Sequence, residues 1–278
     1  VQNTFLFSAL LSSSLTVVVL VFMVFMGLPL LKEGGLFQLL LKPWAPSQGD
    51  FGIFPMIVGT CLIALPGLLV AFPLSLGCSF LISGIAPPPV DKGIRRLIEL
   101  MTGIPTVIYG FVGIFLLVPV IRELFQSGSG LCALTAALVL GIMITPTMTL
   151  LFCDSYKNIP RSYLEAAEAM GASRIQTLLY VVLPTAKKGM LNGILLALGR
   201  AVGDTLIALM LAGNSVQVAG SLLEPARTLT AHIALVIAAD YESPEFRSIF
   251  ACGAVLYLFT MTITFLVRYL GFIEARKT

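Results

Sequence analysis

Charged residues are scarce in this chain of 278 residues. Asp, Glu, Lys and Arg together make up 11% of it, whereas 58% of its residues are hydrophobic. Because soluble domains carry about 25% charged residues, this composition excludes an ordinary water-soluble protein and indicates one that faces lipid. The net charge of +3 says little by itself, and we expect membrane lipid, and no nucleic acid, among the partners.

Motifs for catalysis and for cofactors are also missing. The chain has no G-x-x-x-x-G-K-[ST] phosphate loop, no H-E-x-x-H metal motif and a single histidine, His232. Its five cysteines are scattered through apolar segments without a C-x-x-C pair, which favours small apolar helix residues over a metal or redox site. We therefore expect neither enzymatic activity nor a cofactor in this chain, and its energy source must be another subunit.

Long apolar runs dominate what is present. A helix needs about 20 apolar residues to cross a bilayer, and six stretches of the chain are long enough. They leave no room for a separate soluble domain, so we predict one all-α membrane domain over residues 1–278. The six predicted spans are Thr4–Leu31, Pro55–Ile82, Leu100–Ile121, Leu131–Phe152, Gly189–Ala212 and Ile249–Leu270.

The distribution of Lys and Arg predicts the orientation of these spans, because cytoplasmic segments carry the excess of basic residues. With the N-terminus inside, eleven cations fall on inner segments and five on outer ones, so we expect both termini in the cytoplasm. The segment at about 154–188 is then cytoplasmic, and the loop at about 213–248 is external. The inner cations are Lys92, Arg95, Arg96, Lys157, Arg161, Arg174, Lys187, Lys188, Arg268, Arg276 and Lys277; the outer ones are Lys32, Lys42, Arg122, Arg227 and Arg247.

A polar island, Glu165–Pro184, interrupts the apolar runs between the fourth and fifth spans. Pro160 can open a helix, and Ser162 with Glu165 fits an S-x-x-E capping box. Gly171 is expected to end this first helix in a positive-φ conformation. A second helix, at about 173–182, is expected to end before Pro184. The prediction is a helix-turn-helix lying off the membrane, and the alternative is an ordinary helical loop.

The spacing within this island resembles the ATPase-coupling loop of type I ABC-importer permeases. The resemblance implies a six-helix permease fold, and it implies that ATP and Mg²⁺ are bound by two cytoplasmic ATPase subunits rather than by this chain. Val181 stands where that pattern more often has isoleucine. The residues that would carry coupling are Glu165, Ala166, Ala167, Gly171, Leu183 and Pro184.

Further segments are similar to phosphate permeases of the PstC type, more than to their PstA-type partners. They are Thr102–Phe111, Gly199–Thr205, Ala212–Asn214 and Arg227–Ala231. The resemblance implies import of inorganic phosphate across a prokaryotic inner membrane, with a PstA-like second permease and an external phosphate-binding protein. A permease for sulfate, molybdate, tungstate or phosphonate remains the alternative. A secondary carrier or channel would need no coupling loop and would usually show inverted repeats.

Two charged residues stand in the predicted fifth span. Arg200 lies eleven residues from its inner end, about 16 Å into the bilayer, and Asp204 follows at i+4, so we expect the two to pair. They form either a structural bridge or an anion site in which Asp204 holds Arg200 against a passing oxyanion. Phosphate permeases more often have Glu at the position of Asp204. Thr205 and Asn214 are further candidate liners, or else a packing hydroxyl and a helix-end cap.

Overall fold

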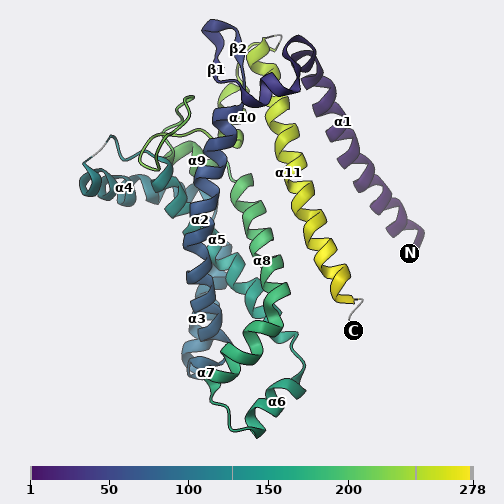
Figure 1. The fold of residues 1–278 in the computed structure, drawn as a ribbon, viewed down its shortest axis with the longest axis vertical. Helices are drawn as coiled ribbons and strands as arrows, with labels where there is room; N and C mark the ends of the chain where they lie inside the picture. The colour runs from purple at the N-terminus through teal and green to yellow at the C-terminus, as the bar shows by residue number, and fades with distance from the viewer. Residues whose placement is uncertain (1, 127, 242, 276–278) are drawn as a thin grey trace.

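A computed structural model describes residues 2–126, 128–241 and 243–275, and nearly all of its regular structure is helical (Figure 1). Two short strands, β1 (Trp44–Ala45) and β2 (Asp50–Phe51), pair antiparallel around a 3-10 turn, η1 (Pro46–Gln48). Two π-helical turns are present: η2 (Leu81–Ile85) follows a long helix, and η3 (Leu178–Val182) joins a short helix to a long one. The α-helices are α1 (Gln2–Leu41), α2 (Phe54–Phe80), α3 (Pro88–Thr102), α4 (Thr106–Phe125), α5 (Ala133–Lys157), α6 (Arg161–Ala169), α7 (Arg174–Thr177), α8 (Leu183–Gly203), α9 (Leu206–Leu211), α10 (Leu229–Val236) and α11 (Pro244–Ala275).

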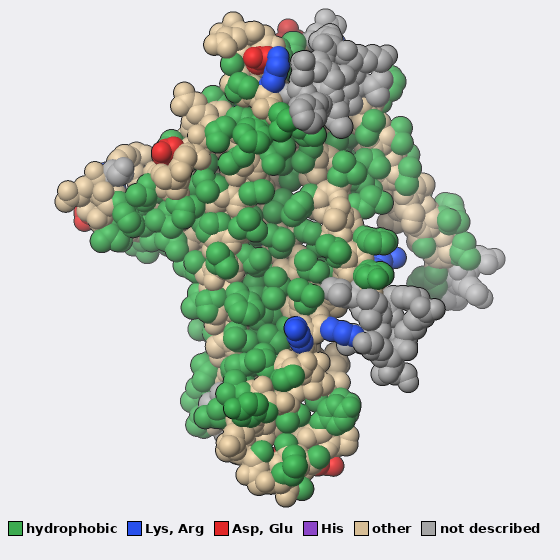
Figure 2. Space-filling model, in the orientation of Figure 1, with side chains coloured by type: hydrophobic (Ala, Val, Ile, Leu, Met, Phe, Trp, Pro, Cys, Tyr) green, Lys and Arg blue, Asp and Glu red, His purple; other side chains and the backbone are tan. Residues whose placement is uncertain are grey.

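Six helical segments of the described chain are long and apolar enough to cross a membrane, as the sequence predicts. Hydrophobic side chains cover most of the face in Figure 2, with charged groups isolated among them. An apolar surface of this extent is stable only against lipid or another protein. The six segments are Thr4–Gly27, Phe54–Ser83, Thr106–Phe125, Ala133–Lys157, Arg174–Gly203 and Pro244–Tyr269.

The core forms around α5, which packs against α2 and α8. Glycines let these backbones touch: a Cβ on Gly141 of α5 would lie 2.8 Å from the carbonyl oxygen of Gly67 on α2. On α8, a Cβ on Gly189 would lie 2.6 Å from the Ser155 hydroxyl oxygen of α5. Close approach through small residues is the usual way membrane helices associate, because lipid gives them no hydrophobic driving force. These contacts fix α8 against α5.

The ends of the molecule differ in structure. The β1–β2 hairpin and α10 lie at one end, and α6 and α7 lie at the other (Figure 1). Helix α1 packs mainly along α11, and the most apolar part of its span, within Thr4–Gly27, has no buried residue. The amino end of α1 and the carboxyl end of α11 both point toward the end that carries α6 (Figure 1). Two cations counted for orientation, Arg276 and Lys277, lie outside the described residues.

The bounds of the third and fifth spans differ most from the predicted ones. The third span begins at Thr106 rather than Leu100, because Gly103 and Pro105 separate the surface helix α3 from α4. The fifth span runs over Arg174–Gly203 instead of Gly189–Ala212. The predicted external loop at 213–248 contains α10 and the first turn of α11.

Candidate coupling surface and substrate path

The coupling island folds as two short helices joined by a turn at Gly171. That residue has φ +77°, the left-handed conformation expected of it, and a Cβ there would meet nothing within 4 Å. Glu165, Ala166 and Pro184 are exposed, whereas Ala167 is buried. Leu183 is half-buried. The six predicted coupling residues therefore sit on one island, and most of them are open to a partner.

The capping box occurs in α7, not in α6, so the prediction at Ser162 is wrong. The Ser173 hydroxyl accepts a hydrogen bond from the Gln176 amide at 3.4 Å, and the Gln176 side chain accepts one from the Ser173 amide at 2.8 Å. In α6 the N-cap is Pro160, which has no side-chain acceptor. Ser162 is therefore already inside the first turn, two residues past the N-cap position from which a hydroxyl caps a helix.

The second helix of the island does not end before Pro184, contrary to the prediction. It passes through the π-helical turn η3 into α8, and the Leu183 amide donates to the carbonyl of Leu178, five residues back. Proline has no N–H to donate, and Pro184 lies at the second residue of α8, directly after the wide turn. The island is thus joined to the fifth span by a continuous helix rather than by a flexible loop.

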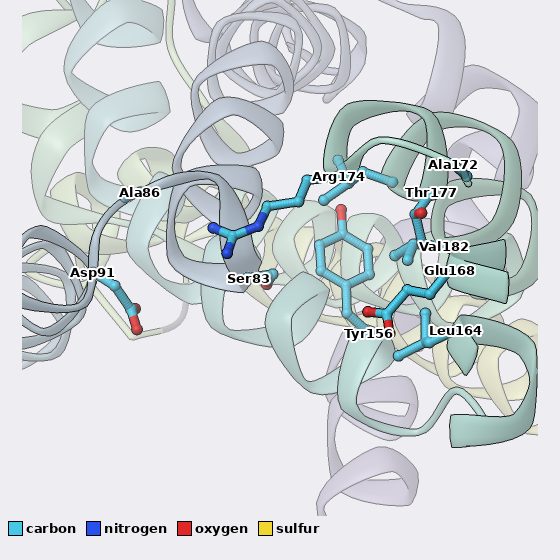
Figure 3. A pocket seen from close by; sticks show the side chains of 11 residues that line it. Ser83, Ala86, Asp91, Tyr156, Leu164, Glu168, Ala172, Arg174, Thr177 and Val182 are labelled. Atoms are coloured by element: carbon cyan, nitrogen blue, oxygen red, sulfur yellow. The ribbon is translucent and has the colours of Figure 1, made fainter. Parts of the chain in front are cut away.

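A hollow of about 500 Å³ lies between the island and the rest of the molecule (Figure 3). Arg174 extends from the island toward Ser83, in η2, and the Tyr156 ring of α5 points into the same space (Figure 3). The Tyr156 hydroxyl lies 3.2 Å from that of Ser79. Leu178 and Val182 also line this hollow and belong to the hydrophobic core, so the island is anchored on one side of the hollow and separated from η2 on the other.

Arg200 lies near the carboxyl end of α8 and is half-buried. Its Nη1 donates to the Thr147 hydroxyl of α5 at 2.6 Å. The charge of Arg200 also acts on the hydroxyl of Tyr109 in α4, which donates to the Met101 carbonyl at 3.0 Å. Among the described residues, the recorded hydrogen-bond partner of the guanidinium is the neutral hydroxyl of Thr147.

Asp204 does not pair with Arg200, so the i+4 prediction is wrong. Helix α8 ends at Gly203, and Asp204 has an extended backbone with ψ 131°, so the chain leaves the helix after this residue. Its carboxylate instead accepts the Ile207 amide at 2.9 Å, at the start of α9. Among the described residues, the ion pairs within 4 Å are Lys42–Asp50 and Lys157–Asp154.

Thr205 and Asn214 belong to the two ends of α9. The Thr205 carbonyl accepts the Leu209 amide at 2.9 Å. The Asn214 side chain donates to the Leu209 carbonyl at 2.6 Å, and Asn214 has φ +56°. This geometry is that of a helix-end cap, one of the two readings left open for Asn214. Asp204, Thr205 and Asn214 thus form the ends of α9, while Arg200 contacts a different helix.

Sequence reasoning missed Thr147 and Tyr109. The signal for Thr147 was present in the sequence: three threonines alternate around Pro146 inside an apolar span, at 145, 147 and 149. The signal for Tyr109 was a single phenol in the Thr102–Phe111 segment. The sequence does not tell which helix lies against α8 at the level of Arg200, because that depends on how the helices pack.

Arg227 and His232, which lie in the predicted external loop, are held by specific contacts in the structure. Arg227 is half-buried and donates from Nε to the Asn214 carbonyl at 2.9 Å. His232 has no exposed surface. Its ring lies 4.4 Å from that of Trp44, edge to face, and its Nε2 lies 3.1 Å from the Ser248 hydroxyl oxygen. His232 thus links α10 to β1 and α11, and Arg227 links the segment before α10 to Asn214.

Comparison with known proteins agrees with this architecture. The chain is 34% identical over 231 residues to the probable ABC transporter permease protein YqgH of Bacillus subtilis, covering 82% of this chain and 75% of that protein. It is 34% identical over 256 residues to the phosphate transport system permease protein PstC of Xylella fastidiosa, covering 84% of this chain and 78% of that protein.

The fold is that of solved ABC importers. The bacterial alginate ABC transporter, in complex with its alginate pentasaccharide-bound periplasmic protein, aligns with a TM-score of 0.65 at 14% identity, over 100% of this chain and 96% of that one. Residues 80–272 match the family described as binding-protein-dependent transport system inner membrane component. This chain, a multi-pass membrane permease by its fold, belongs to that family.

Proposed function

We propose that this chain is one permease subunit of an ATP-driven importer that carries inorganic phosphate into the cytoplasm. Relatives at 30–34% identity are phosphate transport system permeases by their descriptions. The observation that carries the proposal is the state of Arg200, held by the neutral Thr147 hydroxyl and without a carboxylate partner within 4 Å. A guanidinium held in this way keeps its charge and several N–H donors for an oxyanion.

The energy for transport comes from partners. In this proposal, two cytoplasmic ATPase subunits bind ATP and Mg²⁺ and act on the coupling residues of Glu165–Pro184, and a PstA-like second permease completes the pore. An external phosphate-binding protein delivers the anion. The continuous helix from η3 into α8 supports this scheme, because a displacement of α7 reaches Arg200 through one rigid element.

Both termini lie in the cytoplasm in this arrangement. The excess of Lys and Arg favours it, and the ends of α1 and α11 that point toward the α6 end of the molecule are consistent with it (Figure 1). The chain itself needs no cofactor for this role.

Permeases for sulfate, molybdate, tungstate or phosphonate would also need a cationic liner, and they remain the second candidate. Co-purification from native membranes tests the proposal. We expect a second permease and an ATPase to be recovered with this chain, and ATP hydrolysis by the complex to be stimulated by a binding protein loaded with phosphate. Stimulation by sulfate or molybdate instead would move the chain to the second candidate, and recovery of the chain alone would favour a secondary carrier.

A further inference from the structure

Thr147 differs from the two threonines that flank it on α5. The Thr145 hydroxyl donates to the carbonyl of Gly141 at 2.7 Å, and the Thr149 hydroxyl donates to the carbonyl of Thr145 at 2.8 Å. Each is tied back to the preceding turn of its own helix, which is the usual arrangement for a hydroxyl in a membrane helix. Both are buried, whereas Thr147 is half-buried.

The Thr147 hydroxyl takes the opposite role and accepts a hydrogen bond, from Nη1 of Arg200 at 2.6 Å. Within the part of the chain that the structure describes, its own proton is not donated to any carbonyl. A hydroxyl has one proton to donate and two lone pairs, so this group can hold Arg200 and still donate to a further acceptor.

A neutral partner suits a cation that must bind an anion for a short time. A carboxylate would neutralise the guanidinium, whereas a hydroxyl fixes its orientation and leaves its charge in place. An anion path also has to release what it admits. Arg200 presents the charge from α8, and Thr147 holds it from α5, the helix to which the glycines of α8 pack closely.

We propose that Thr147 is a positioning residue for Arg200 and a second hydrogen-bond donor to the transported oxyanion. The two side chains form one subsite, in which Arg200 donates N–H groups and Thr147 donates its hydroxyl proton to oxygens of the anion. The inference rests on the proposed function, because it assigns a ligand role within the same path.

Three variants of the full complex, reconstituted with its binding protein, test this subsite. Thr147→Val keeps the shape and removes the hydroxyl, Thr147→Ser keeps the hydroxyl, and Thr149→Val is the matched control because it makes the same change two residues away, where no contact to Arg200 exists. We expect phosphate uptake to fall about tenfold in Thr147→Val and to stay within about twofold in the other two. Recovery of the complex should be unchanged in all three, and basal ATP hydrolysis should be unchanged in the control Thr149→Val.

A double variant separates positioning from packing. If the two side chains form one subsite, adding Thr147→Val to Arg200→Gln lowers uptake by clearly less than the loss of about tenfold that Thr147→Val causes alone, because the effects of interacting residues are not additive. Equal losses in Thr147→Val and Thr149→Val, or full additivity with Arg200→Gln, would overturn the inference. Normal uptake in Thr147→Val beside impaired Arg200→Gln would overturn it and leave the proposed function standing. No phosphate uptake by the unchanged complex would overturn both.

Discussion

The fold of the coupling island depends most on the backbone conformation of Gly171. At φ +77° a residue with a Cβ is strained by about 1–2 kcal/mol, and asparagine tolerates this region better than alanine does. Since a Cβ here would meet nothing within 4 Å of this chain, the strain is conformational rather than steric. We therefore expect Gly171→Asn to retain more binding-protein-stimulated ATP hydrolysis than Gly171→Ala. The reverse order would mean that close approach by the ATPase, and not φ, requires glycine.

His232 should stay neutral well below the usual pH for histidine. Burial lowers its pKa to about 4, and the positive charge of Arg227 acts in the same direction. The unfolded chain, with a histidine pKa near 6.5, binds the proton first, so stability is full above about pH 6.5 and is lost as the pH falls toward 4. Between about pH 6.5 and pH 4, this group lowers the free energy of unfolding by about 3 kcal/mol.

Trp44 offers a direct measurement of this titration. It is the only tryptophan of the chain, its ring lies 4.4 Å from that of His232, and a charged imidazolium quenches indole fluorescence. We expect the fluorescence of the purified chain to fall with a midpoint near pH 4, and we expect His232→Gln to abolish the step. A midpoint near 6.5 would contradict the burial of this histidine.

For single residues, the sequence was a better guide to the functional side chains than to the partners that these side chains contact. The i,i+4 rule predicted a pair between Arg200 and Asp204, but that rule applies only while a helix continues. Gly203 ends α8, and Asp204 caps α9 instead. The partner of Arg200, Thr147, lies 53 residues earlier in the chain, and no local rule connects positions so far apart.

Among the elements, α7 has the best-defined start. Ser173→Ala removes one half of its capping box and should cost about 1 kcal/mol, which corresponds to about fivefold faster amide hydrogen exchange over residues 174–177. Ser162→Ala is the matched control, because Ser162 makes no side-chain cap of α6. We expect it to leave exchange in both helices unchanged. Faster exchange in Ser162→Ala alone would restore the capping box predicted from the sequence.

The elements themselves were largely predictable, while their junctions were not. Apolar runs fix where a span exists, and Gly171 was correctly expected to end α6. The junction at Pro184 was misjudged because a proline usually stops a helix, and only the π-helical turn before it lets this one continue. Such a turn has no simple sequence signature, since it depends on how α8 packs on α5.

For the whole molecule, hydropathy was sufficient to predict six spans, because each needs only about 20 apolar residues. It could not predict that α5 would be the buried centre and α1 the exposed edge, since both are apolar throughout and differ only in what they pack against. The exposed sides of α1 and α4 contact lipid or another subunit, as apolar surfaces in a membrane do.

The central claim is that partner subunits drive phosphate past Arg200, and uptake of labelled phosphate into vesicles containing the complete importer tests it most directly. We expect phosphate accumulation to require both ATP and the loaded binding protein. In Arg200→Ala we expect uptake to fall tenfold or more, roughly the effect of removing a charged hydrogen-bond donor, while the complex still assembles. Normal phosphate uptake by Arg200→Ala, or accumulation without ATP, would contradict it.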